Sequence, residues 1–307
     1  MSVNSPARGT APDRTVRERF LAHIALTKPR IVELLLVTAV PTMFLAAGGL
    51  PTLRATIAVL VGGALAAMGA NTLNSVYDRD IDAVMHRTGN RPAAMGVVSV
   101  RAGLFQGFVL TVASAFFLGW WTNYLAAVLA LVAVFLYAVG YTMWLKRRTP
   151  QNIVWGGAAG CMPVLIAWSA VTGTLSWTPV VLFLIVFFWT PPHYWPLAMK
   201  YRDDYEAAGI PMLPVVRSPR QVSRSIVVYS WVMVATSLAL IPVAGMGWVY
   251  GICSVVLGAA FLALAYRLHS GTRTMEDPTS LAMRLFHFSI TYLALLFLAV
   301  AVDPFIG

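Results

Sequence analysis

Long runs of apolar residues restrict the fold of this chain more than any other feature. A helix that crosses the hydrocarbon layer of a membrane needs about 20 predominantly apolar residues. The chain has 307 residues, 59% of them hydrophobic and only 11% charged, which excludes a water-soluble globule. The sequence therefore predicts an all-α integral membrane protein, a bundle of nine transmembrane helices. The predicted spans are about 31–50, 55–77, 103–121, 124–145, 152–173, 177–199, 225–245, 248–267 and 285–303.

The positive charges predict the orientation of the bundle. The formal net charge is +10, and the 22 Lys and Arg residues lie outside the predicted spans or at their ends. When the loops are assigned alternately to two sides, one side receives Arg54 as its lone basic residue. Because cytoplasmic loops carry the excess of Lys and Arg, we expect the N-terminus inside and the C-terminus outside. This pattern favours a multi-pass cell-membrane protein that contacts membrane lipid and an anionic substrate, and no nucleic acid.

The chain is predicted to have one domain. Residues 1–22 are basic and polar and are predicted to be a disordered cytoplasmic tail, while 23–307 form a single intramembrane domain. No signal peptide is expected, because a full-length span follows the polar N-terminal stretch without a cleavage site. Cys161 and Cys253 lie in predicted spans, which favours buried thiols over a disulfide or a metal site.

Function is expected in the two long cytoplasmic segments, 78–102 and 200–224, which are charged and rich in Gly and Pro. At the first of them, Asn74, Asp78 and Asp82 are spaced four apart, so one helix face would present all three side chains. Carboxylates that close repel unless a cation lies between them, and Mg²⁺ suits such a site. The alternative is a solvated helix end whose acids pair with nearby arginines. Depth favours function, since Asn71 and Asn74 lie within the apolar span.

The second cytoplasmic segment and the helix before it hold further candidates. His193 is predicted to lie about two turns inside the membrane, where an imidazole could stabilise a cation or move a proton. A histidine that bonds a backbone carbonyl freed by Pro191 and Pro192 is the alternative. Asp203 and Asp204 could bind a metal, or they could balance neighbouring basic residues.

These residues form part of a set of recognisable motifs. Asn74-x-x-x-Asp78-x-x-x-Asp82 resembles the first aspartate-rich motif of the UbiA superfamily of intramembrane prenyltransferases. Its extension from Met85 to Pro92 resembles, more narrowly, the protohaem IX farnesyltransferases or haem O synthases. Three further blocks are similar to the same group: 27–33, 141–154, and 189–193 with 209–214. The resemblance covers about residues 20 to 220, and the last three helices match in length and apolarity only.

The resemblance implies a reaction and a set of roles. Such enzymes transfer a farnesyl group from farnesyl diphosphate to a vinyl group of haem b with the help of Mg²⁺, and diphosphate leaves. The implied metal ligands are Asn74, Asp78, Asp82 and Asp204, and His193 joins them as a catalytic residue. The implied substrate-binding residues are Asn71, Arg87, Arg91, Lys146, Arg147 and Asp203. Many relatives have Asp-x-x-x-Asp in the second segment, where this chain has Tyr201 and Tyr205, so the number of metal ions stays open.

Two other functions compete with haem farnesylation. The same fold could prenylate a different acceptor, such as a quinone precursor, because the metal chemistry would be shared. A transporter could also place polar residues in helices, although transporters usually bind near the midplane rather than at one face. The resemblance also suggests partners in the haem pathway or in oxidase assembly, for which the residues give no separate indication.

Overall fold

The fold is helical throughout the residues that the computed structural model describes, which are 15–275 and 277–306, without the side chains of 30, 31, 33 and 34. The helices are α1 (Val16–Leu26), α2 (Pro29–Ala47), α3 (Leu53–Tyr77), α4 (Arg79–Val84), α5 (Val100–Trp121), α6 (Tyr124–Phe135), the π-helix η1 (Leu136–Leu145), α7 (Asn152–Thr172), α8 (Trp177–Lys200), α9 (Arg202–Ala207), α10 (Leu213–Val216), α11 (Pro219–Ala244), α12 (Trp248–Thr274) and α13 (Thr279–Ile306).

Eight helical segments within the described residues are long and apolar enough to cross a membrane. They are α3, α5, α6 continued by η1, α7, α8, α11, α12 and α13. The predicted span 31–50 corresponds to α2, whose apolar part, Leu35–Ala47, is shorter than the eight segments above. The prediction of an all-α, multi-pass membrane protein is therefore confirmed, whereas the ninth crossing and the orientation stay predictions.

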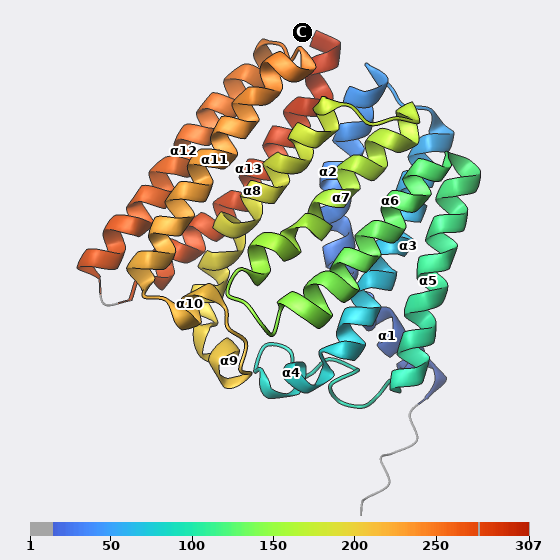
Figure 1. Ribbon diagram of the computed structural model, residues 1–307, viewed down its shortest axis with the longest axis vertical. Helices are drawn as coiled ribbons and strands as arrows, with labels where there is room; N and C mark the ends of the chain where they lie inside the picture. Colours follow the sequence, from blue (N-terminus) through green and yellow to red (C-terminus); the bar gives the residue numbers. More distant parts are fainter. Residues whose placement is uncertain (1–14, 276, 307) are drawn as a thin grey trace, which may run out of the picture.

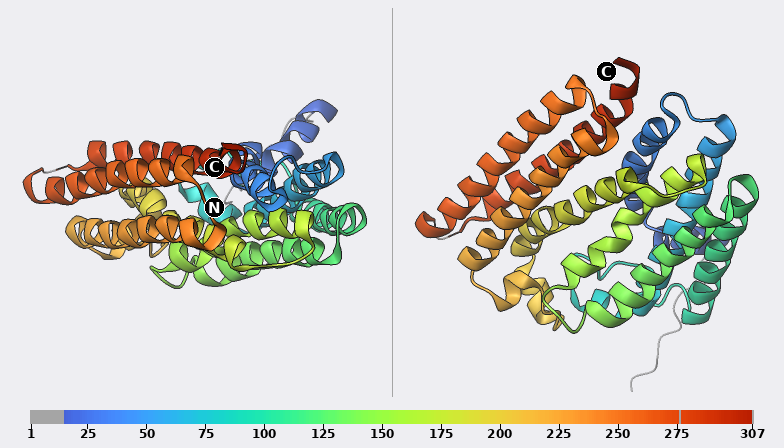
Figure 2. Two further views of the ribbon diagram at one scale, coloured as in Figure 1. Left: turned by 90° about the horizontal axis from the view of Figure 1, so that it is seen from above. Right: turned by 45° about the horizontal axis from the view of Figure 1, so that its top comes forward.

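The helices lie in two rows that face each other, as the view from above shows (Figure 2, left). In one row α2 packs on α3 and α13, and in the other α8 packs on α7 and α11. The rows are joined where α2 packs on α7 and α13 packs on α8. Helices α1, α4 and α9 lie at one end of the bundle, which we call the motif end, and α13 finishes at the other end (Figure 1).

Helix α1 occupies part of the segment that was predicted to be a tail. The Thr15 hydroxyl accepts the Glu18 N–H, and the Glu18 carboxylate accepts the Thr15 N–H at 2.9 Å. This reciprocal capping satisfies backbone donors that a helix start leaves free. Residues 16–22 of the predicted tail are therefore helical, while residues 1–14 lie outside the described residues.

The connections at the two ends of the bundle differ in length. At the end away from the motif, α7 and α11 stop at Gly173 and Gly245, whose φ angles of 71° and 63° suit glycine and allow tight turns. At the motif end, residues 85–99 and 201–218 form long connections that include α9 and α10. These connections bring charged side chains against the ends of the spanning helices.

Candidate active site

The predicted acidic motif lies where α3 meets α4. Asn74 is in the last turn of α3, Asp78 stands between the helices, and Asp82 is in α4. The four-residue spacing survives this junction, because the Asp78 N–H donates to the Asn74 carbonyl at 2.9 Å and the Asp82 N–H donates to the Asp78 carbonyl at 2.8 Å. The three residues are buried, with exposed fractions of 4%, 0% and 2%. Their burial contradicts the alternative of a solvated helix end.

Each carboxylate of the motif pairs with a cation that was predicted to bind substrate. Lys146, the residue that follows η1, donates from its Nζ to Asp78 Oδ2 at 2.5 Å. Arg91 Nη1 donates to both carboxylate oxygens of Asp82, at 2.9 and 2.8 Å. A buried charge is costly unless it is paired, so these bonds explain how two carboxylates are retained inside the bundle.

One oxygen of the motif, Asp78 Oδ1, has no hydrogen-bond partner among the described residues. The nearest guanidinium nitrogen, Nη2 of Arg147, is 3.7 Å away, which is too far for a hydrogen bond. Asn74 Nδ2 donates at 2.7 Å to the other oxygen, Oδ2. An unpaired buried acceptor costs free energy, and a bound cation would remove that cost. Asp78 Oδ1 therefore fits a metal ligand.

The donor set also suits Mg²⁺ rather than a metal that needs a protein cage. No group of three or more His, Cys, Asp and Glu side chains gathers within the described part of the chain. Mg²⁺ typically takes one or two carboxylates and completes its octahedron with water and phosphate oxygens. Asp78, Asp82 and the amide oxygen of Asn74 supply ligands of this kind.

Lys28 joins the motif although the sequence analysis did not single it out. It lies between α1 and α2, and its Nζ donates to Asn74 Oδ1 at 2.5 Å. Its φ of 51° makes it the one non-glycine residue with positive φ among the described residues. Burial and the nearby Arg91 charge lower the pKa of Lys28 to about 7, and an anion bound beside it would favour its charged form.

Helix α3 holds the strained segment at Lys28 in place. Asn71 Nδ2 donates to the Thr27 carbonyl at 3.1 Å, and the Ser75 hydroxyl donates to the Leu26 carbonyl at 3.3 Å. Strained backbone persists where its surroundings determine it, and it gathers at functional sites. Asn71, predicted to bind substrate, thus also positions Lys28.

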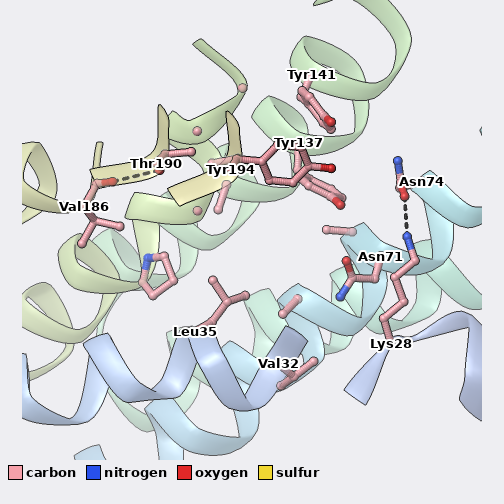
Figure 3. A pocket seen from close by; sticks show the side chains of 18 of the residues that line it. Lys28, Val32, Leu35, Asn71, Asn74, Tyr137, Tyr141, Val186, Thr190 and Tyr194 are labelled. Atoms are coloured by element: carbon pink, nitrogen blue, oxygen red, sulfur yellow. Dashed lines mark hydrogen bonds between the residues drawn. The ribbon is translucent and has the colours of Figure 1, made fainter. Parts of the chain in front are cut away.

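A cavity of about 470 Å³ extends from the motif into the bundle. Seven of the predicted site residues line it: Asn71, Asn74, Asp82, Arg87, Arg91, Lys146 and His193. The body of the cavity is mostly apolar and is built by α2, α3, α6, α7 and α8. Figure 3 shows Lys28 bonded to Asn74 at one side, with Tyr137, Tyr141 and Tyr194 facing the same space. The cavity therefore joins a polar mouth to an apolar interior.

In the second acidic segment Tyr205 lines the cavity, whereas Asp203 and Asp204 do not. Asp203 is exposed, and Asp204 accepts a hydrogen bond at 3.3 Å from the Arg87 N–H. His86 Nδ1 lies 2.9 Å from Asp204 Oδ1, and this bond lowers the pKa of Asp204. Asp204 and His86 therefore hold the backbone of Arg87, whose side chain does line the cavity.

Arg147 also lies outside the cavity lining. Its guanidinium donates two hydrogen bonds of 2.8 Å to Asp80, and these bonds lower the pKa of Asp80 to about 2. It also lies over the Tyr77 ring, 5.0 Å from the centroid. Arg147 thus fixes the start of α4 beside Asp78, a role that the sequence pattern did not indicate.

His193 lines the cavity from α8 and is held from two sides. Its ring stacks between Trp189 and Phe286, with centroid distances of 4.0 and 4.9 Å. Its Nδ1 lies 2.6 Å from the Ser289 hydroxyl of α13. The bond goes to a side chain rather than to a carbonyl freed by the prolines, so that alternative does not describe the ring. Stacking and this bond fix the orientation of the imidazole.

The π-helix η1 supplies the aromatic side of the cavity mouth. Tyr137 and Tyr141 line the cavity, and their ring centroids lie 5.6 Å apart. The Thr142 hydroxyl accepts from Asn74 Nδ2 at 3.0 Å, which ties η1 to the motif. The Lys146 N–H donates to the Tyr141 carbonyl five residues earlier, at 2.8 Å. Irregular turns of this kind are frequent at functional sites.

The chain and its fold are similar to those of known proteins. The model of the UbiA prenyltransferase family matches residues 35–301. The chain belongs to this family. Solved structures share its fold: one described as digeranylgeranylglyceryl phosphate synthase has a TM-score of 0.76 at 14% identity, covering 94% of this chain and 99% of that chain. A UbiA homologue from Archaeoglobus fulgidus bound to GPP and Mg²⁺ has a TM-score of 0.62 at 18% identity, covering 92% and 100%.

Within the UbiA family, this chain is most informatively compared with relatives that it matches over nearly its full length. A protein named protoheme IX farnesyltransferase from Streptomyces avermitilis is 53% identical over 307 residues, covering 100% of both chains. A protein of the same name from Clavibacter sepedonicus is 54% identical over 289 residues, covering 94% of each. The resemblance seen in the motifs is thereby confirmed, and it extends to the last three helices that the motifs did not cover.

Proposed function

We propose that this protein transfers a farnesyl group from farnesyl diphosphate to a vinyl group of haem b, which gives haem O and diphosphate. The observation that carries this proposal is the 53% identity over the whole chain to a relative named protoheme IX farnesyltransferase. The cavity supports it, because its charged mouth suits a diphosphate and its apolar body suits a prenyl chain.

In the proposed reaction the C1–O bond of farnesyl diphosphate breaks and the diphosphate leaves with the electron pair. The π electrons of the vinyl group form the new bond to C1, and water adds to the resulting cation with loss of a proton. Mg²⁺, held by Asn74, Asp78 and Asp82, would offset the charge that develops on the diphosphate. Arg91 and Lys146 lie at the same mouth and would bind phosphate oxygens.

The remaining lining residues would handle the acceptor. Arg87 projects from a backbone fixed by Asp204, and it would bind a phosphate or a haem propionate. The stacked His193 faces the cavity beyond the mouth, where it would contact the haem or take up the released proton. The predicted metal-ligand role of Asp204, the substrate-binding roles of Asp203 and Arg147, and the oxidase-assembly partners stay predictions.

The charge distribution supports a cytoplasmic position for the motif end. The predicted cytoplasmic loops carry the basic residues, and α1, α4 and α9 lie together at this end (Figure 1). Farnesyl diphosphate would then reach the mouth from the cytoplasm, while its chain and haem b lie among the helices at the level of the lipid.

Purified protein given Mg²⁺, farnesyl diphosphate and haem b tests the proposal by product mass. We expect haem b to gain a farnesyl group and a hydroxyl group. Formation of no haem O, together with prenylation of a quinone precursor under the same conditions, would assign the protein to the other acceptor class. Absence of any prenyl transfer, with transport of a labelled substrate in vesicles, would favour the transporter.

A further inference from the structure

The mouth of the cavity holds one cation for each residue of the acidic motif. Lys146 pairs with Asp78, Arg91 pairs with Asp82, and Lys28 occupies the amide oxygen of Asn74. Asn74 is uncharged, so no ion pair explains why an ammonium group lies there. The position of Lys28 therefore needs another physical account.

The backbone around Lys28 indicates that its position is specified. A lysine rarely adopts a φ of 51°, and an ordinary surface lysine has no need of it. Bonds from Asn71 and Ser75 to the two carbonyls before Lys28 hold the segment against α3. The side chain is half-buried and lines the cavity, as Figure 3 shows. The fold therefore directs this ammonium group at the site.

The contact of Lys28 conflicts with the proposed metal site. An ammonium nitrogen 2.5 Å from Asn74 Oδ1 and a magnesium ion at its usual distance of about 2.1 Å from the same oxygen would lie within about 5 Å of each other. Two cations that close repel strongly in a partly buried site. The flexible lysine stem allows the ammonium to move away, and phosphate oxygens bound at the mouth are its nearest new acceptors.

We propose that Lys28 is a further diphosphate-binding residue, which occupies Asn74 Oδ1 until Mg²⁺ and the prenyl diphosphate enter and then transfers its hydrogen bond to a diphosphate oxygen. This inference rests on the proposed function, because it assumes the metal and the diphosphate. It gives Lys28 two opposite effects. Lys28 competes with a metal ion that arrives alone, and it stabilises a metal ion that arrives with diphosphate.

Lys28→Asn is the sharpest test, because asparagine tolerates left-handed backbone and is too short to replace the ammonium group. Mn²⁺ is the probe, since it prefers the same oxygen ligands and is detected by electron paramagnetic resonance. Without diphosphate, we expect the variant to bind Mn²⁺ more tightly than the unsubstituted protein. With Mn²⁺ present and haem b omitted, we expect its affinity for farnesyl diphosphate to fall about tenfold or more, as loss of a charged hydrogen bond predicts.

Two further variants separate charge from folding. Lys200→Asn removes an equal charge from the motif end, where Lys200 lies beside Tyr201 with its Nζ 5.6 Å from the ring centroid, and it should change neither affinity. Lys28→Arg keeps the cation and should retain most of the diphosphate affinity. Should Lys28→Asn not fold, Lys28→Gln repeats the test with a neutral side chain of similar shape.

The outcomes distinguish this inference from the function on which it rests. If Lys28→Asn leaves the affinities for Mn²⁺ and for farnesyl diphosphate unchanged, or weakens both equally, Lys28 does not move between Asn74 and the diphosphate. If Lys28→Asn binds Mn²⁺ more tightly and farnesyl diphosphate more weakly, but the unsubstituted protein makes no haem O, the exchange is supported and haem b is not the acceptor. Absence of Mn²⁺ binding to the unsubstituted protein, even with farnesyl diphosphate, would remove the metal site and the exchange together.

Discussion

Two buried carboxylates at opposite ends of the bundle are stabilised in different ways. Asp303, near the end of α13, accepts hydrogen bonds from the Gly247 N–H at 2.5 Å and the Tyr250 N–H at 2.9 Å, so both of its oxygens are satisfied by the start of α12. Asp78 is bonded by Lys146 and Asn74 through one oxygen, and its other oxygen has no partner among the described residues.

The difference distinguishes a carboxylate with a structural role, Asp303, from a carboxylate at a candidate metal site, Asp78. Asp303 caps a helix, where a negative charge meets free backbone donors, and it needs no cation. Asp78 stands among cations from other segments and keeps a lone pair directed at no donor. The same contrast runs through the bundle: polar groups of α11, α12 and α13 bond one another, whereas those of α3 and η1 border the cavity.

Asp78→Asn should show the largest effect. Loss of this carboxylate removes a metal ligand and leaves Lys146 without its buried partner, so we expect haem O formation to fall about a thousandfold or more. The measurement is the kcat/KM for farnesyl diphosphate. Glu206→Gln is the control, since Glu206 is an exposed acid at the same end of the bundle and pairs only with the exposed Arg202 among the described residues. A comparable loss in the control would show that local charge, rather than a metal ligand, matters.

Lys146→Met should have the second-largest effect, a fall of about a hundredfold in the kcat/KM for farnesyl diphosphate. The substitution keeps the length of the side chain and removes a cation that would bind the leaving diphosphate. Lys200→Met on the same set of measurements should remain active, because Lys200 does not line the cavity. Retention of full activity in Lys146→Met would place diphosphate binding elsewhere.

Asp303→Ala should change stability and leave the chemistry intact. It leaves two N–H donors without their acceptor at the start of α12, which costs about 1–3 kcal/mol of unfolding free energy. Thermal unfolding in detergent checks the loss, and kcat per folded protein should be unchanged. A drop in kcat without a drop in stability would mean that α13 takes part in the reaction.

Tyr292→Phe should have the smallest effect, about 1 kcal/mol of stability. The Tyr292 hydroxyl shares a 2.9 Å hydrogen bond with Ser237, and both side chains are buried away from the cavity. Ser237→Ala should give a similar loss, and the double variant should cost less than the sum of the two because they share one bond. The rate of haem O formation per folded protein should be the same in these variants as in the unsubstituted protein.

The sequence predicted the spanning helices and the acidic motif because both depend on local patterns. Apolar runs fix the helices, and a four-residue repeat, which helical hydrogen bonds carry across the junction of α3 and α4, fixes which side chains share a face. Asn74, Asp78 and Asp82 could therefore be placed without any knowledge of the tertiary fold. The membership of Arg91, Lys146 and His193 in the same cavity was expected from family motifs, and the structure brings them together.

Other features depend on contacts between distant segments. Lys28 reaches Asn74 only because α3 holds the backbone before it, and nothing in a Lys-Pro pair predicts this packing. Asp204 was expected at the metal, but its contact with His86 and Arg87 depends on how α9 meets the segment after α4. The helix at Val16–Leu26 was overlooked for a different reason, because its capping box was visible in the residues.

The winding of η1 sets the angular position of Lys146. Lys146 follows Tyr137 by nine positions, so in an α-helix of about 3.6 residues per turn the two side chains would point to opposite sides. With i→i+5 bonds each residue turns by roughly 80°, and nine residues complete close to two full turns. Tyr137 and Lys146 then share the cavity side. The π-helix changes the angle at which Lys146 leaves the helix axis, so the number of residues in η1 determines whether the lysine faces Asp78 or the lipid.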